Sequence, residues 1–132
     1  MTDQQYSRKL ERMLATYDKW LYAEQNGKTV EQYLCQKNFY NIAIYGYGML
    51  GKHLFFNLLN SRVCVEYVID KNAERVFLLN EKEVYTIDDY LPDVDAIIVT
   101  LGDWEIARKV KSELEKKFLN KVILFSEMIH MM

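Results

Sequence analysis

The apolar positions of the first forty residues repeat with the spacing of α-helices. The capping-box pattern Thr-x-x-Gln occurs at Thr2 and again at Thr29, and Asn26-Gly27 between them is typical of a helix end. We therefore predict a helical hairpin over residues 1–40. The apolar face of its first helix consists of positions at offsets of 0, 3, 4, 7 and 11 residues: Leu10, Met13, Leu14, Tyr17 and Leu21.

From residue 41 onward, short apolar runs alternate with helical patterns. Runs of strand length occupy residues 41–45, 63–69, 95–100 and 122–125, and a weaker one lies around Val84-Tyr85. Helical patterns lie between them at 50–59 and 103–118, and Thr86 to Asp89 predicts a brief helix that Pro92 helps to end. Strands that are apolar along their whole length are typical of parallel sheets covered on both faces. The alternation predicts an α/β domain over residues 41–132, a doubly wound parallel sheet of about five strands in the order 3-2-1-4-5.

Composition narrows the class of protein. A length of 132 residues fits one domain, and 17 Lys and Arg against 19 Asp and Glu argue against a nucleic-acid binder. No apolar run is long enough to span a bilayer, and the N-terminus lacks the apolar centre of a signal peptide. The two cysteines form neither a disulfide framework nor a metal knuckle. We expect a soluble, cytoplasmic protein.

A glycine pattern joins the first predicted strand to the helix that follows it. Gly46 permits a sharp turn, the missing side chain at Gly48 lets a pyrophosphate approach the backbone, and Gly51 allows close packing of helix and strand. The loop Gly46-Tyr47-Gly48-Met49-Leu50-Gly51 then offers its amides to phosphate oxygens at the positive end of the helix dipole. The alternative is a tight strand-to-helix turn without a ligand.

An acidic residue ends the second strand, 19 residues after Gly51. The carboxylate of Asp70 is placed to accept hydrogen bonds from the hydroxyls of an adenosine ribose, and it would repel a 2′-phosphate. This favours NAD over NADP, although the neighbouring Lys71 partly offsets the charge. The alternative is that Asp70 is a solvated loop acid.

The fourth strand ends in Thr100-Leu101-Gly102, at the carboxyl edge of the sheet and across the switch point from the glycine loop. Gly102 is placed to let a ribose or nicotinamide approach the backbone. An ordinary turn before the helix that Asp103 caps explains these residues equally well.

The chain resembles the NAD(P)-binding Rossmann superfamily over roughly residues 41–126. The closer likeness is to small Rossmann modules of bacterial surface-polysaccharide and sugar-nucleotide biosynthesis proteins. It rests on Ile42 to Gly48, Tyr67 to Asp70 and Asp95 to Thr100, and on three pairs ahead of the sheet, Trp20-Leu21, Gly27-Lys28 and Tyr33-Leu34. The resemblance implies a nucleotide ligand and a role in carbohydrate or cell-surface metabolism. Similar modules in some sugar N-acyltransferases hold a UDP-sugar on a Gly-Gly-His-Gly type of loop, from which Gly48-Met49-Leu50-Gly51 departs.

The sequence contains no complete catalytic constellation. Apart from the residues used by the sheet and its helices, only the hairpin is left that could bind a substrate and supply a proton donor. We interpret His53 as a helix-surface residue, His130 as part of a C-terminal tail, and Cys35 and Cys64 as small buried residues, with no metal site. We therefore favour an accessory or regulatory module that binds NAD(H). The alternatives are a UDP-sugar-binding domain or enzyme fragment that a partner completes, and an interaction domain that has lost its ligand.

Aromatic residues are dense in the hairpin, which is too small to bury them alone. Two interpretations stand: the hairpin packs on the sheet, or its first helix forms a homodimer face. The residues concerned are Tyr6, Tyr17, Trp20, Tyr22 and Tyr33.

Overall fold

Both predicted capping boxes begin a helix in the computed structural model, which describes residues 2–75, 82–118 and 121–132. The helix α1 spans Asp3–Gln25 and α2 spans Val30–Gln36. At the start of α1, the Thr2 hydroxyl accepts the N–H of Gln5 at 3.1 Å, and the Gln5 side chain accepts the N–H of Thr2 at 2.8 Å. Gly27, with φ of 77°, follows the last turn of α1, where the sequence predicts the helix to end.

Five parallel strands form one sheet in the spatial order β3-β2-β1-β4-β5. This Rossmann-like topology confirms the predicted fold class and strand order. From β1 the chain adds β2 and β3 on one side of the sheet and then β4 and β5 on the other. The topological switch point therefore lies at the carboxyl ends of the neighbours β1 and β4. The strands are β1 (Asn41–Tyr45), β2 (Cys64–Ile69), β3 (Glu83–Tyr85), β4 (Ala96–Val99) and β5 (Lys121–Leu124).

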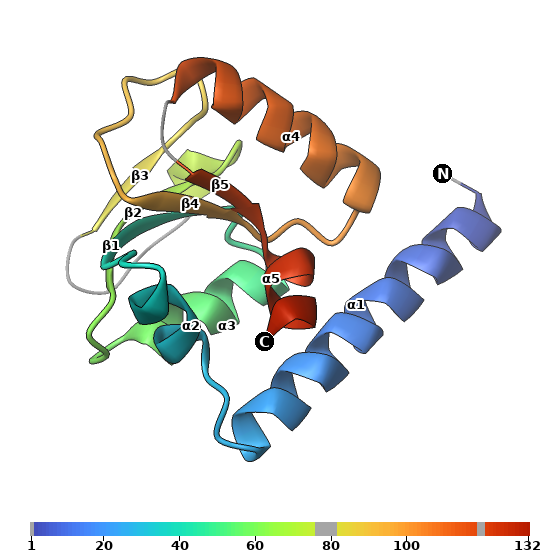
Figure 1. The fold of residues 1–132 in the computed structure, drawn as a ribbon. Coiled ribbons are helices and arrows are strands. Elements are labelled where there is room, and N and C mark those ends of the chain that lie inside the picture. Colours follow the sequence, from blue (N-terminus) through green and yellow to red (C-terminus); the bar gives the residue numbers. More distant parts are fainter. Residues whose placement is uncertain (1, 76–81, 119–120) are drawn as a thin grey trace.

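Helices cover both faces of the sheet (Figure 1). Along β1, Ile42 and Ile44 face one core cluster and Ala43 and Tyr45 face the other, as the pleat of a strand requires. The first cluster lies under α2, α3 (Met49–Leu58) and α5 (Phe125–Met131), and it also takes in Trp20 of α1. The second lies under α4 (Trp104–Lys117). The N-terminal helices therefore pack on the sheet in a shared core.

The structure differs from the sequence prediction at two places. The brief helix expected from Thr86 to Asp89 is wrong: the Asp89 carboxylate accepts both the N–H and the hydroxyl of Thr86, and the N–H of Asp89 donates to the Thr86 carbonyl. These local bonds close a turn and leave no helix to propagate. The residues after β5, expected to form a tail, are the helix α5, and its Met128 and Ile129 are buried. A short 3₁₀ turn, Ala73–Arg75, follows β2.

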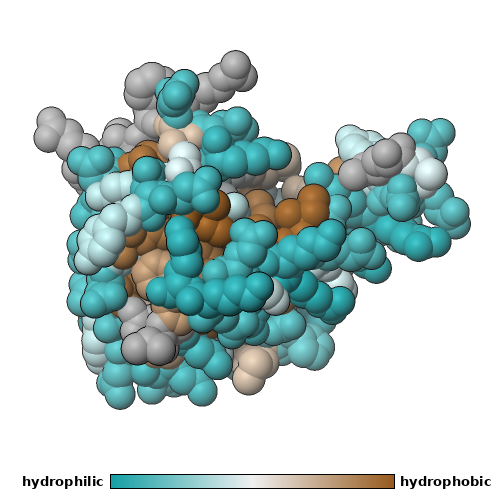
Figure 2. All heavy atoms as spheres, turned by 90° about the horizontal axis from the view of Figure 1, so that it is seen from above, coloured by the Kyte–Doolittle hydropathy of each residue, from teal (hydrophilic) through white to brown (hydrophobic). Residues whose placement is uncertain are grey.

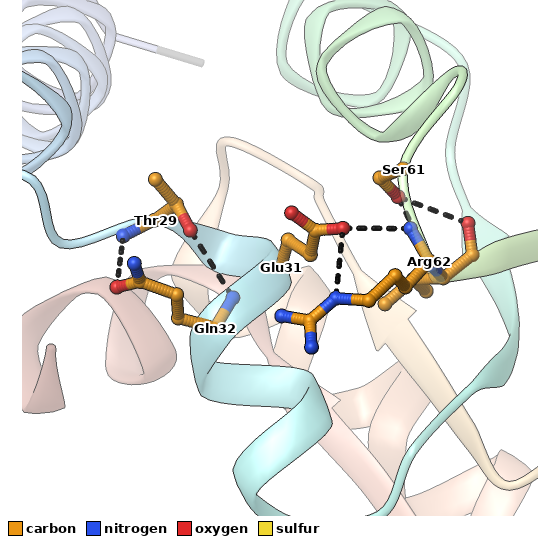
Figure 3. Close-up of polar contacts among 6 residues, drawn as sticks. Thr29, Glu31, Gln32, Ser61 and Arg62 are labelled. Atoms are coloured by element: carbon orange, nitrogen blue, oxygen red, sulfur yellow. Dashed lines mark hydrogen bonds and ion pairs between the residues drawn. The ribbon is translucent and has the colours of Figure 1, made fainter.

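Polar contacts hold α2 against the loop between α3 and β2 (Figure 3). The Glu31 carboxylate accepts the backbone N–H of Arg62 at 2.6 Å and the Nε–H of Arg62 at 3.4 Å. The backbone hydrogen bond, followed by the weaker contribution of the guanidinium, lowers the pKa of Glu31. In the same loop, the Ser61 hydroxyl donates to the Val63 carbonyl and accepts the Val63 N–H. This connection positions the loop that precedes β2.

Replacing Trp20 tests how much the packing of α1 contributes to the stability of the domain. The Trp20 side chain is 7% exposed and meets the Phe125 ring edge-to-face at 4.8 Å. Trp20→Ala is expected to lower the free energy of unfolding by about 3–5 kcal/mol, measured by urea denaturation. Tyr22→Ala on the same helix is the control, since Tyr22 is 68% exposed and its loss is expected to change stability by less than about 0.5 kcal/mol. Equal effects of the two variants would contradict the shared core.

Candidate functional site

The glycine loop lies where β1 passes into α3, and its backbone is bound to both neighbouring strands. Gly46 has φ of 94°, a conformation that favours glycine. Its N–H donates to the Ile69 carbonyl of β2 at 2.7 Å. Its carbonyl oxygen accepts the hydroxyl of Thr100, at the end of β4, at 2.9 Å. The loop is therefore held at the switch point by bonds to both sides.

Gly51 lies against the start of its own loop. A Cβ at Gly51 would stand 1.8 Å from the Gly46 carbonyl oxygen and 2.9 Å from the Thr100 hydroxyl oxygen. Only glycine fits in that space, so the first turn of α3 approaches the end of β1 as the sequence pattern predicts.

The start of α3 is exposed at Gly48 and Met49, whereas Leu50 and Gly51 are buried. Gly48 is the N-cap and provides no side-chain bond to the helix, and a Cβ there would have nothing within 4 Å. The N–H of Lys52 makes the first bond to the Gly48 carbonyl, so the four amides of residues 48–51 have no acceptor within the helix. By contrast, α1, α2 and α4 each begin with a side-chain cap and an acidic residue in the first turn.

The side chains of the loop differ in their burial. The Tyr47 ring packs edge-to-face on Phe55 at 5.9 Å, and burial raises the pKa of Tyr47. Met49 is 60% exposed, whereas Leu50 is buried in the core and contributes only its backbone to the loop surface.

Asp70 lies beside the loop at the end of β2. One carboxylate oxygen accepts the N–H of Tyr47 at 2.8 Å, and the other accepts the N–H of Asn72 at 2.8 Å. A carboxylate has about four lone-pair sites, so each oxygen retains acceptor capacity. Lys71 is exposed beside it. The structure thus brings the predicted acid and the glycine loop together.

The far side of the switch point is more enclosed. Thr100 is buried, and its hydroxyl is bonded to the carbonyls of Tyr45 and Gly46, so it braces the loop. Leu101 packs partly into the core. A Cβ at Gly102 would stand 2.8 Å from the sulfur of Met13, so α1 lies over this end of β4. The sequence pattern places Met13 on an apolar helix face but does not reveal its contact with Gly102.

The remaining candidates lie apart from the loop. The His53 ring contacts Tyr17 edge-on at 6.1 Å, and His130 Nδ1 lies 2.8 Å from Lys19 Nζ. Burial, followed by the neighbouring Glu66, raises the pKa of Cys64, which disfavours its thiolate. No metal-binding group of three or more His, Cys, Asp or Glu side chains occurs among residues 2–75, 82–118 and 121–132.

Comparison with known proteins adds no family to this description. No protein-family model, no curated protein and no solved structure matches the chain. None of the helices in the described ranges is both long and apolar enough to cross a membrane. What the chain shares with Rossmann proteins is the topology of its sheet.

The contact at Gly51 predicts how far the loop tolerates substitution. Gly51→Ala is expected to lower the free energy of unfolding by about 3 kcal/mol, since its methyl group overlaps the Gly46 carbonyl. Gly48→Ala is the matched control and is expected to cost less than about 1 kcal/mol. Thermal and urea unfolding measure both variants. A stable Gly51→Ala protein would show that α3 does not need its close approach to β1.

Proposed function

We propose that the chain is a nucleotide-binding module, with NAD(H) as its preferred ligand. The observation that carries the proposal is the uncapped, exposed start of α3 at the switch point of the sheet, with the Asp70 carboxylate beside it. Ligands of open α/β sheets bind in this crevice.

The pyrophosphate would bind at the four free amides of residues 48–51. The missing side chain of Gly48 leaves room for phosphate oxygens, and the helix dipole attracts their charge. Lys52 is the first charged residue of α3 and adds a cation at the same end of the helix. The packing of Tyr47 on Phe55 and the exposure of Met49 support this function over that of an interaction domain whose loop has filled its own phosphate position.

The ribose would bind at Asp70. Since Tyr47 and Asn72 use one lone pair on each oxygen, the carboxylate can still accept from two vicinal hydroxyls. A phosphate on the 2′ position would meet the negative charge, which favours NAD over NADP. The exposed Lys71 reduces that preference.

A UDP-sugar is the second candidate, favoured by the contact between Met13 and Gly102. The nicotinamide half of NAD would extend toward the end of β4, where α1 already covers the backbone. A nucleoside diphosphate with a smaller second part needs less of this space.

We place the module in an accessory or regulatory role. The chain offers the crevice few groups for proton transfer, and an enzyme built on it would need a partner to complete the site. The link to bacterial carbohydrate or surface-polysaccharide metabolism rests on the sequence resemblance alone.

Gly48→Asp separates ligand binding from folding. An aspartate at this N-cap is expected to bond the free amides and maintain or raise the melting temperature, yet abolish nucleotide binding by occupying and repelling the phosphate position. The measurement is a thermal-shift screen with NAD, NADH, NADP and UDP-sugars, in which ligand at 100 times Kd stabilises the wild type by about 2.7 kcal/mol.

The control is Tyr90→Asp, which adds the same charge at a residue that is 87% exposed. It is expected to bind like the wild type. A ligand shift that survives Gly48→Asp would refute binding at the glycine loop, and a wild type that responds to no nucleotide would refute the proposed function.

Asp70→Asn tests the ribose assignment. The amide oxygen retains an acceptor for the Tyr47 N–H, but the charge and the acceptor for the Asn72 N–H are lost, so the affinity for NAD is expected to fall about tenfold. The preference for NAD over NADP is expected to disappear, because the repulsion of the 2′-phosphate is lost. Titration calorimetry gives both constants, and an unchanged ratio of the two would contradict a ribose at Asp70.

A further inference from the structure

Large apolar side chains are exposed on α1 and on α3. The C-terminal half of α1 lies beside α3, whereas its N-terminal half lies beside the start of α4. Leu10, Leu14 and Leu21 form a stripe on α1 and are 41%, 68% and 60% exposed. Met49 and Phe56, one face of α3, are 60% and 48% exposed. A groove of about 610 Å³ lies between the C-terminal half of α1 and α3 and borders Leu21 and Phe56 of the two rows. It is lined by Tyr17, Trp20, Leu21 and Glu24 of α1 and by His53, Phe56 and Asn57 of α3. We call these rows and the groove the α1–α3 surface.

We propose that the α1–α3 surface is where a second copy of this chain docks, forming a symmetric dimer. The area is of the right size. Five side chains of roughly 200 Å², each about half exposed, present on the order of 500 Å² of apolar surface. A standard interface buries about 800 Å² per partner, of which about 57% is apolar. The largest apolar patch of a monomeric protein typically measures about 300–600 Å² and is often functional.

The shape of the surface is self-complementary. It carries both a ridge, the leucine stripe of α1, and a groove beside that ridge. In a two-fold dimer the same surface serves both partners, so the ridge of each copy can enter the groove of the other. The first turns of α1 project from the body of the molecule, in reach of such a copy (Figure 2).

Charges at the two edges select one orientation. At 100° per residue, Glu11 and Asp18 lie along the edge of the leucine stripe that faces away from α3. Lys52 lies on the edge of α3 that faces away from α1. With the two-fold axis parallel to the helices, α1 of each copy lies over α3 of the other. Tyr17 lies at the level of His53, so the neighbouring Asp18 meets Lys52 of the second copy. An axis perpendicular to them would place Glu11 and Asp18 against the same acids.

The same acids argue against a lipid membrane as the occupant. An anionic lipid surface repels carboxylates at the border of an apolar face. Rim charges add little affinity, but they determine orientation and partner choice.

The test is sedimentation of the full chain between 1 and 200 µM. A mass of twice 15.8 kDa is expected for the wild type. Leu14→Glu and Phe56→Glu are each expected to raise the dimer Kd at least 100-fold, because each places two charges in an apolar interface. Tyr90→Glu is the control: Tyr90 is 87% exposed and lies outside both α1 and α3, so the dimer Kd is expected to stay within twofold.

Charge reversal tests the orientation with variants that leave the apolar residues intact. Lys52→Glu is expected to weaken the dimer, and combining it with Asp18→Lys is expected to restore it. A wild type that remains monomeric at 200 µM, or a dimer that withstands both Leu14→Glu and Phe56→Glu, would overturn the proposal. So would a monomer that binds phosphatidylcholine–phosphatidylglycerol vesicles through Leu14. Circular dichroism verifies the fold of each variant.

Discussion

The carbonyl oxygen of Gly46 is the point on which the arrangement of this domain depends. It accepts the hydroxyl of Thr100 at 2.9 Å, and it occupies the space that a side chain at Gly51 would need. The N–H of the same residue donates to Ile69. The backbone of one residue thus joins β1 to β2, β4 and α3. Because these contacts use the backbone and a buried hydroxyl, the loop keeps its shape while the amides at the start of α3 remain free.

The helix α1 contacts the end of β4 with one side and presents its leucine stripe to solvent with another. Its Met13 covers Gly102, its Trp20 enters the core beside Phe125, and its leucine stripe faces outward next to α3. The residue that restricts the far side of the crevice and the leucine stripe of the α1–α3 surface therefore belong to the same helix. A ligand extending past the switch point would meet α1 directly. The position of α1 therefore limits how long a bound ligand can be.

The sequence predicts this fold well because each element carries its own signal. The apolar runs locate all five strands, and the two capping boxes locate α1 and α2. The turn at Thr86 was mistaken for a helix because Thr and Asp bond the backbone in caps and turns alike. The helix α5 has Phe125, Met128 and Ile129 at helical spacing, a signal obscured by its position directly after a strand.

The candidate site is only partly predictable, since its contacts join residues distant in sequence. The spacing of the glycines predicts the close approach of Gly51, and strand ends place Asp70 near the loop. The bracing role of Thr100 and the cover of Met13 over Gly102 depend on tertiary packing, to which a local pattern is blind.

The most direct test of the central claim is a two-dimensional ¹H–¹⁵N NMR titration of the full chain with NAD(H). The account predicts that the largest shift changes occur at the amides of residues 46–51 and 70–72, where the free helix start and the Asp70 carboxylate lie. Changes confined to other residues, such as those around Trp104 and His130, would contradict it, and so would a spectrum that saturating ligand leaves unaltered.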